Sequence, residues 1–288
     1  VGDFSLGRVM AQRQDFAGAA AEFRKSVAAR PDDPLPLEGL IRSLLAAGKK
    51  AEAIEELKGQ IEKPENPLFA KFLLGSIYAS DGDTAQAERY LNEVVKEKPS
   101  IALAWVSLAG AYKDPAQRLD VLKRGVQAVP DHAELRMLLG SEYEKLNRID
   151  DAIATYEEAL KVSPEYEPAV NNLAALLLDY RTDKASHERA LKLARQLANQ
   201  ENPAMLDTLG WAHYRVGEYP EAVRVLERVV AKAGEFPVFR YHLGMAYLNS
   251  GNPVGARQEL RQAVDKAQGT YPGLDEARAT LEKLDKAS

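Results

Sequence analysis

Cysteine is absent from the 288 residues, and the chain also lacks long apolar runs and clusters of basic residues. Without cysteine it can form neither disulfide bonds nor thiolate metal sites. No apolar run approaches the roughly 18 residues that a membrane-spanning helix needs. The net charge is −5 and the Lys and Arg residues are scattered, whereas nucleic-acid-binding proteins usually carry a basic patch. We therefore expect no transmembrane segment and no nucleic-acid partner.

The sequence also lacks the common signatures of enzyme sites. Its four histidines include no pair with the HExxH spacing of a zinc-binding helix. No GxSxG elbow, P-loop or GxGxxG segment occurs. The many carboxylates are expected on exposed helix faces, where charged side chains usually lie. These absences predict a protein that is not an enzyme, with no catalytic residues, no cofactor and no metal ion.

What the chain has instead is an internal repeat. A Leu-Gly pair recurs at residues 6–7, 74–75, 139–140, 209–210 and 243–244, with weaker pairs at 40–41, 108–109 and 173–174. The second residues of these pairs are 34, 34, 34, 31, 34, 36 and 34 residues apart. An alanine recurs twelve residues after most of them, at Ala19, Ala53, Ala87, Ala152, Ala222 and Ala256. Self-similarity at such a period is the signature of a repeat architecture.

The clearest copy covers residues 133–166, AELRMLLGSEYEKLNRIDDAIATYEEALKVSPEY. It resembles the tetratricopeptide repeat, a helix–turn–helix unit, at Leu139, Gly140, Tyr143, Ala152, Tyr156, Ala159 and Pro164. The resemblance implies an all-α fold, a right-handed superhelical solenoid of such units. Residues 1–288 would form a single solenoid domain with a C-terminal capping helix at 273–287. About eight repeats are expected, at 1–33, 34–67, 68–101, 102–132, 133–166, 167–202, 203–236 and 237–270.

Local patterns support the helical hairpins independently of the resemblance. Apolar residues recur at the i, i+3, i+4 and i+7 spacing of a helix. Turns with positive φ are expected where glycine separates the two helices, at Gly48, Gly82, Gly217 and Gly251, with Asn147 and Arg13 at the same position in other repeats. Two repeats are irregular, with a shortened turn at 113–118 and a longer turn at 179–190. Such turns either lie on a binding face or vary neutrally.

Aligning the first helix of every repeat predicts a concave groove. The position three before the small residue holds Phe4, Glu38, Phe72, Val106, Met137, Asn171, Asp207 and Tyr241, and the position after it holds Arg8, Arg42, Ser76, Gly110, Ser141, Ala175, Trp211 and Met245. Aromatic side chains in a concavity commonly anchor partner peptides. The expected partner-binding residues are Phe69, Phe72, Met137, Asn171, Trp211, Tyr214, Tyr241 and Met245. The alternative is that the superhelix itself or a terminal helix covers them.

Other side chains are assigned to packing by the same alignment. Trp105 holds the position that is usually aromatic in the family, and His213 replaces the tyrosine of other repeats, so both are expected to pack between helices. Some tetratricopeptide co-chaperones grip a terminal carboxylate with Lys and Asn at the groove positions. Neither row contains a Lys, so such a clamp is not expected here.

The C-terminal half resembles a more particular group. Residues 171–180, 202–230 and 237–252 are similar to bacterial proteins linked to exopolysaccharide production and export and to PEP-CTERM sorting systems. This implies a protein-binding scaffold of the cell envelope, periplasmic or anchored at the outer membrane, with the cytoplasm as the alternative compartment. Other hypotheses are direct polysaccharide binding, with Trp211, Tyr214 and Tyr241 stacking on sugar rings, and an accessory domain of a larger enzyme or export protein.

The first residues, VGDFSLGRVM, lack an initiator Met and already follow a helical pattern. This predicts that the chain is a fragment from which an upstream segment is missing. The first repeat would then expose a stacking face, and a homodimer through that face is a further hypothesis.

Overall fold

The computed structural model describes residues 2–286, which form α-helices, one short 3-10 helix and no strand. The expected all-α class is confirmed. The helices group into two compact units, residues 1–135 and 136–288, each of which is described here by itself. The organisation of residues 1–288 as one domain of eight repeats stays a prediction. Among the described residues, no helix is both long and apolar enough to cross a membrane.

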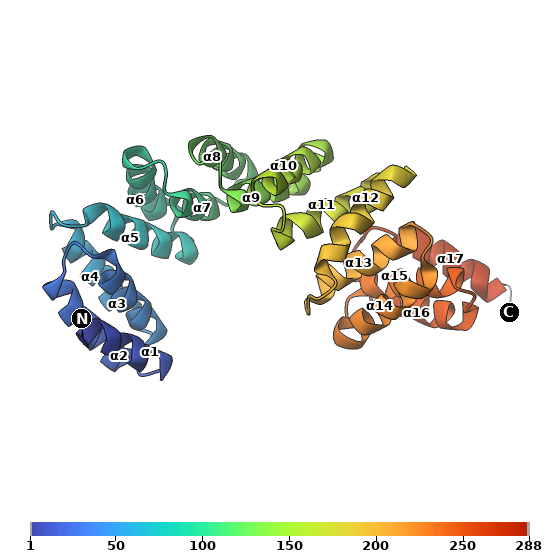
Figure 1. The fold of residues 1–288 in the computed structure, drawn as a ribbon, viewed down its shortest axis with the longest axis horizontal. Coiled ribbons are helices and arrows are strands. Elements are labelled where there is room, and N and C mark those ends of the chain that lie inside the picture. The colour runs from blue at the N-terminus through green and yellow to red at the C-terminus, as the bar shows by residue number, and fades with distance from the viewer. Residues whose placement is uncertain (1, 287–288) are drawn as a thin grey trace. The chain divides into compact units, whose positions relative to one another are not determined.

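Unit 1 is a stack of helices joined by short turns, in which each helix packs against the next along the chain (Figure 1). Alternate helices also touch, as α1 does with α3 and α5 with α7. Its helices are α1 (Gly2–Gln12), α2 (Phe16–Ala29), α3 (Pro34–Ala46), α4 (Lys50–Ile61), α5 (Pro67–Asp81), α6 (Thr84–Glu97), α7 (Ala102–Ala111) and α8 (Pro115–Ala128).

Unit 2 continues the same pattern, and the boundary between the units falls within α9. Its helices are α9 (Ala133–Lys145), α10 (Ile149–Val162), α11 (Glu167–Tyr180), α12 (Lys184–Ala194), η1 (Arg195–Leu197), α13 (Pro203–Arg215), α14 (Tyr219–Ala233), α15 (Pro237–Asn249), α16 (Pro253–Asp265) and α17 (Leu274–Lys286). The last helix, α17, packs against both α16 and α15, so it occupies the place that the first helix of another hairpin would take.

The sequence marks where many of these helices begin. Asp15, Asp83 and Asp114 precede α2, α6 and α8, and each carboxylate accepts a hydrogen bond from a backbone N–H three residues later, at 2.9, 3.2 and 2.8 Å. Such caps satisfy N–H groups that the first turn of a helix leaves without partners. Several helices carry proline in the first turn, where its missing N–H costs nothing.

Six of the hairpin turns share one geometry. A residue one or two positions after the first helix has positive φ, and the next N–H bonds to the carbonyl five residues earlier, as Asp83 does to Tyr78 at 3.0 Å. The positive φ falls on Gly48, Gly82, Gly217, Gly251, Asn147 and Gln14. The assignment of Arg13 to this position was therefore wrong by one residue.

Small residues allow the two helices of a hairpin to cross closely. The six repeated alanines, from Ala19 to Ala256, have no solvent exposure. A Cβ at Gly75 would lie 2.6 Å from Leu91, and one at Gly140 would lie 2.5 Å from Tyr156. These distances are too short for a larger side chain, which explains why small residues recur at this position.

The two irregular repeats replace the turn with a side chain. The residues that follow their first helices, Tyr112 and Arg181, have extended conformation, with ψ of 133° and 146°. Arg118 donates to the Tyr112 carbonyl at 3.2 Å, and His187 Nε2 lies 2.8 Å from the Arg181 carbonyl. Arg118 and His187 each lie four residues after the N-cap of the second helix, Asp114 or Asp183. Other repeats have alanine at this position. The expected long turn at 179–190 is wrong, because α11 ends at residue 180 and α12 begins at residue 184.

Candidate functional site

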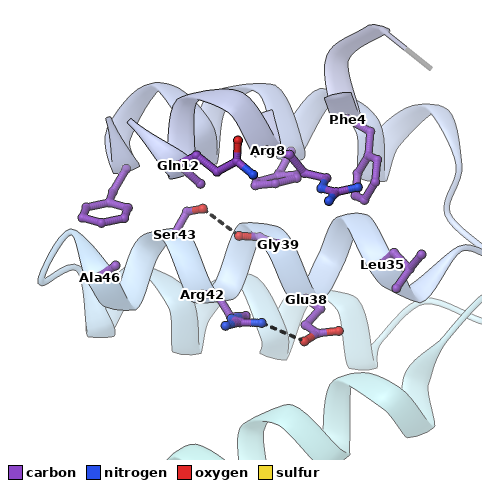
Figure 2. A pocket seen from close by; sticks show the side chains of 12 residues that line it. Phe4, Arg8, Gln12, Leu35, Glu38, Gly39, Arg42, Ser43 and Ala46 are labelled. Atoms are coloured by element: carbon purple, nitrogen blue, oxygen red, sulfur yellow. Dashed lines mark hydrogen bonds and ion pairs between the residues drawn. The ribbon is translucent and has the colours of Figure 1, made fainter. Parts of the chain in front are cut away.

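A groove lies in unit 1, between the facing sides of α1 and α3 (Figure 2). It encloses about 730 Å³, within the range of about 300–1,000 Å³ typical of ligand pockets. Two smaller hollows of about 360 and 390 Å³ lie elsewhere. The α1–α3 groove, defined here by its lining residues, is formed by Phe4, Arg8, Ala11, Gln12, Phe16, Phe23, Leu35, Glu38, Gly39, Arg42, Ser43 and Ala46.

A phenylalanine keeps the two walls of the α1–α3 groove apart. The Phe23 ring, from α2, lies against Gly7 of α1 and Gly39 of α3, where an added Cβ would approach it to 3.1 and 2.7 Å. At the equivalent position several other repeats carry the smaller leucine, as at Leu91 and Leu226, whereas the repeat at 133–166 carries Tyr156. Phe23 is buried, so it forms the floor of the groove and acts as a spacer between α1 and α3.

Charged side chains line the middle of the groove. Arg8 projects from α1, while Glu38 and Arg42 project from α3 one helical turn apart (Figure 2). The Arg42 guanidinium lies 3.5 Å from the Glu38 carboxylate, and the Arg42 side chain is 79% exposed. Ser43 does not offer its hydroxyl proton to the groove, since it donates to the Gly39 carbonyl at 2.8 Å.

Apolar side chains flank these charges. At one end of the view Phe4 and Leu35 face each other across the groove, and Ala46 marks the other end (Figure 2). Phe4 meets Phe23 edge-on at 5.6 Å between ring centroids, and the Arg30 guanidinium lies 5.3 Å from its centroid. Leu35 is 55% exposed. The groove therefore combines apolar anchor points with charged groups, the usual composition of a peptide-binding surface.

A second aromatic cluster lies in unit 2 and is closed. The Trp211 ring stacks on Tyr214 at 4.5 Å and on His242 at 4.1 Å, and it also meets Tyr241 at 5.5 Å. His242 Nδ1 is 2.9 Å from both carboxylate oxygens of Asp207, and this pair is buried. The cluster is thus an interface between α13 and α15.

The terminal helix α17 covers the cluster from the other side. The Tyr241 hydroxyl donates to the Glu276 carboxylate of α17 at 2.6 Å. A Cβ at Gly273, just before α17, would overlap the Tyr241 ring, so glycine permits this close approach. Burial raises the pKa of Tyr241, and the neighbouring Glu276 carboxylate raises it further.

Sequence profiles of the tetratricopeptide repeat match residues 4–67, 38–100, 72–133 and 208–272, and another profile of the same repeat matches 133–166. The chain belongs to the tetratricopeptide repeat family. The resemblance drawn from residues 133–166 is confirmed. Tetratricopeptide repeats build extended concave binding surfaces, so the fold is that of an interaction scaffold.

Relatives of this tetratricopeptide protein are distant. A TPR repeat-containing protein of Pseudomonas aeruginosa is 27% identical over 84% of this chain and 35% of the relative. Protein FlbA of Caulobacter vibrioides is 25% identical over 84% of this chain and 41% of the relative. Cellulose synthase operon protein C of Pseudomonas fluorescens is 24% identical over 80% of this chain and 18% of the relative. The chain thus spans less than half the length of these relatives.

Solved structures agree on the fold. A crystal structure of the APC/C hetero-tetramer Cut9–Hcn1 gives a TM-score of 0.61 at 14% identity, covering 93% of this chain and 52% of that one. A tetratricopeptide repeat protein from Parabacteroides merdae gives 0.52 at 14% identity, over 88% of this chain and 98% of that one. At such identities the likeness concerns the fold alone.

Three of the residues expected on an open groove are buried. Trp211, Tyr241 and Met245 are 6%, 2% and 5% exposed. Their expected placement on an open surface is therefore wrong, because Trp211 packs against Tyr241 and His242 of α15, and Tyr241 in turn contacts the terminal helix α17. The alternative, in which the superhelix or a terminal helix covers the aromatic residues, holds for this part of the tetratricopeptide stack. No ring face of Trp211 is open to a sugar.

The other five expected residues are half-buried. Phe69 and Phe72 lie together on α5 of unit 1, with ring centroids 6.2 Å apart. Met137 lies on α9, and the Asn171 amide donates to Asn172 at 3.3 Å. Tyr214 also keeps part of its ring exposed. Whether any of them contacts a partner stays a prediction.

The packing roles expected for Trp105 and His213 agree with their surroundings. Trp105 is buried and its indole N–H donates to the Pro99 carbonyl at 2.8 Å. His213 is buried beside Glu218, with Nδ1 2.6 Å from the carboxylate. In the part of the chain that the structure describes, no group of three His, Asp or Glu side chains is arranged to hold a metal ion.

The groove residues Arg8, Glu38 and Arg42 were not among the expected partner-binding residues, although the alignment of first helices contains them. The prediction weighted aromatic content and so favoured the C-terminal half. The missed signal is Phe23, since an aromatic ring at a position that leucine holds in several other repeats lies between the two helices. Two arginines at equivalent positions of successive repeats were the second signal.

Proposed function

We propose that this protein is a non-catalytic scaffold that binds a segment of a partner protein in the α1–α3 groove. The observation that carries the proposal is the groove itself, which joins apolar anchor points to exposed charged side chains in a repeat fold. Tight peptide binding needs a concave surface where side chains can be desolvated, and the cavity between α1 and α3 offers one.

The composition of the groove favours a protein partner over a polysaccharide. Sugar binding typically uses an open aromatic face, and Trp211 and Tyr241 have none in the folded unit. In the α1–α3 groove, Phe4 is engaged by Phe23 and Arg30, and Phe16 lies among aliphatic, polar and charged side chains. A peptide can match both kinds of wall with neighbouring side chains.

The proposed setting is a bacterial envelope assembly linked to exopolysaccharide export or protein sorting. Two observations support it. The segments 171–180, 202–230 and 237–252 resemble proteins of such systems, and one relative is named cellulose synthase operon protein C. The chain spans only part of the length of its relatives, so the proposed role concerns the tetratricopeptide portion that they share with it.

A groove-filling variant tests this proposal. Ala46 is exposed and lines the groove, whereas its neighbour Ala47 is exposed and does not. Immobilised wild-type protein, Ala46→Trp and Ala47→Trp would each be incubated with envelope extract of the native host, and bound proteins identified by mass spectrometry. We expect at least one protein that wild type and Ala47→Trp retain and Ala46→Trp loses. If all three retain the same proteins, the groove is not the binding surface.

A further inference from the structure

We propose that the α1–α3 groove selects a partner segment by side-chain carboxylates, which Arg8 and Arg42 bind, next to an apolar residue that rests on Phe4 and Leu35. This inference rests on the proposed function, because it names the chemistry of the segment that the groove would hold. The partner segment would carry aspartate or glutamate within its sequence, so that side-chain carboxylates rather than a terminal carboxylate are bound.

The charge of the groove points to an acidic segment. Its walls carry two arginines and one glutamate, although the whole chain has a net charge of −5. The groove is thus locally positive in a protein of the opposite sign. Complementary charge of this kind steers association and excludes partners of the wrong sign.

Arg8 is the more available of the two cations. Among residues 2–286, no carboxylate forms an ion pair with Arg8, and its residue is exposed on the α1 wall. A structural arginine is usually held by an ion pair, as Arg24 is by Glu52 and Glu56 at 2.9 and 3.1 Å. The guanidinium group of Arg8 therefore retains its capacity for a bidentate bond to a carboxylate.

Arg42 is partly occupied by Glu38. Their ion pair is long at 3.5 Å, and both side chains are exposed, at 79% and 41%. Exposed pairs of this kind contribute little to stability, so a partner carboxylate can displace Glu38. Glu38 then repels an acidic segment and weakens its binding. Removing its charge should strengthen binding, an effect that damage to the fold could not produce.

The geometry also suggests the spacing of the acidic residues. Arg8 and Arg42 hold equivalent positions on α1 and α3, one on each wall (Figure 2). Packed helices lie roughly 8–10 Å apart, and an extended chain advances about 3.1–3.4 Å per residue. Two carboxylates about three residues apart would reach both arginines, with the apolar residue toward Phe4 and Leu35.

Selection from a library of random peptides displayed on phage tests the inference without a known partner. Selected peptides would be synthesised, together with versions in which Asn or Gln replaces Asp or Glu. Binding would be measured by fluorescence anisotropy to wild type and to three variants: Arg8→Gln/Arg42→Gln, Glu38→Gln, and the control Lys192→Gln/Arg228→Gln. The control removes two exposed cations of unit 2 that lie outside the groove.

We expect the selected peptides to be enriched in Asp or Glu beside Leu or Phe. The double arginine variant should bind them about tenfold more weakly, or about threefold for each exposed ion pair. Glu38→Gln should bind them about twofold to fivefold more tightly, and the control variant should bind like wild type. Selection of peptides without acidic residues, or unchanged binding by the double arginine variant, would overturn the inference.

The same experiment separates this inference from the proposed function. If selected peptides lose binding to Ala46→Trp but lack acidic residues, the groove binds peptides and only the carboxylate preference is wrong. If no selected peptide is sensitive to Ala46→Trp, the groove does not bind peptides and both proposals fail.

Discussion

Replacement of Gly39 by alanine tests whether Phe23 spaces α1 from α3. A Cβ at residue 39 would lie 2.7, 2.8 and 2.9 Å from three atoms of the Phe23 ring, whereas ordinary contacts begin near 3.4 Å. On its other side the ring lies against Gly7, where an added Cβ would also stand only 3.1 Å away, so the ring is flanked by both helices. Forcing extra volume into such a core costs about 1–3 kcal/mol, against a gain in helix propensity of about 1 kcal/mol.

Gly59 supplies the matched control. It lies exposed in α4 of the same unit, and nothing approaches an added Cβ within 4 Å. Gly59→Ala should therefore stabilise the protein by about 0.5–1 kcal/mol, while Gly39→Ala should destabilise it by about 1 kcal/mol. The two variants would be compared by the midpoint of urea unfolding, followed by far-UV circular dichroism.

A second substitution removes the clash. Phe23→Leu supplies the smaller leucine found at this position in several other repeats. In the Phe23→Leu background, Gly39→Ala should therefore lower the free energy of unfolding by less than it does in wild type, so the effects of the two changes should be non-additive. If Gly39→Ala stabilises the protein as much as Gly59→Ala does, the Phe23 ring is free to move and the spacer explanation is refuted.

Three further predictions concern unit 2. His187→Ala introduces the alanine of other repeats but removes the bond to the Arg181 carbonyl, so it should lower the free energy of unfolding by about 1–2 kcal/mol. A midpoint of urea unfolding at or above that of wild type would contradict this prediction. Tyr241→Phe removes the hydroxyl that binds Glu276, so it should lower the free energy of unfolding by a similar amount, measured by the same urea unfolding. An unchanged midpoint would show that this hydrogen bond does not hold α17 in place. Burial raises the pKa of Tyr214 from 10.0 to about 12. The stabilising contribution of the neutral Tyr214 side chain is therefore complete below pH 10 and is lost as the pH rises toward 12. Tyr214→Phe should weaken this alkaline loss of stability, measured by urea unfolding at several pH values.

The regular part of the fold could be predicted because its causes are local in sequence. Alanine at helix crossings and glycine or asparagine at turns each reflect one steric requirement, which recurs at a fixed spacing. At the first turn the regular spacing leads to Gln14, a residue type that rarely takes positive φ, which accounts for the error at Arg13. The turn at 179–190 was misjudged where the spacing shifts. At His187 a side chain takes over the role of a turn, and the repeat pattern carries no signal for that.

Burial of the aromatic cluster could not be predicted from repeat phase. The phase places Trp211 on a helix face, but the aromatic rings of α15 determine whether that face is open. Large side chains at Tyr241 and His242 fill the space that a groove would need. In unit 1 a groove is open, because Phe23 separates α1 from α3 and leaves a cavity between them. The small residues of the first helices did not by themselves predict this cavity.

Site-specific photo-crosslinking compares the two candidate surfaces most directly. A benzophenone amino acid would replace Gln12, which lines the α1–α3 groove, or Tyr214, which borders the aromatic cluster of unit 2. Each protein would be irradiated with envelope extract of the native host and its adducts identified by mass spectrometry. We predict a specific protein adduct from position 12 that Ala46→Trp abolishes, and no specific adduct from position 214. A specific adduct from position 214 with none from position 12 would contradict the assignment of the α1–α3 groove as the binding surface.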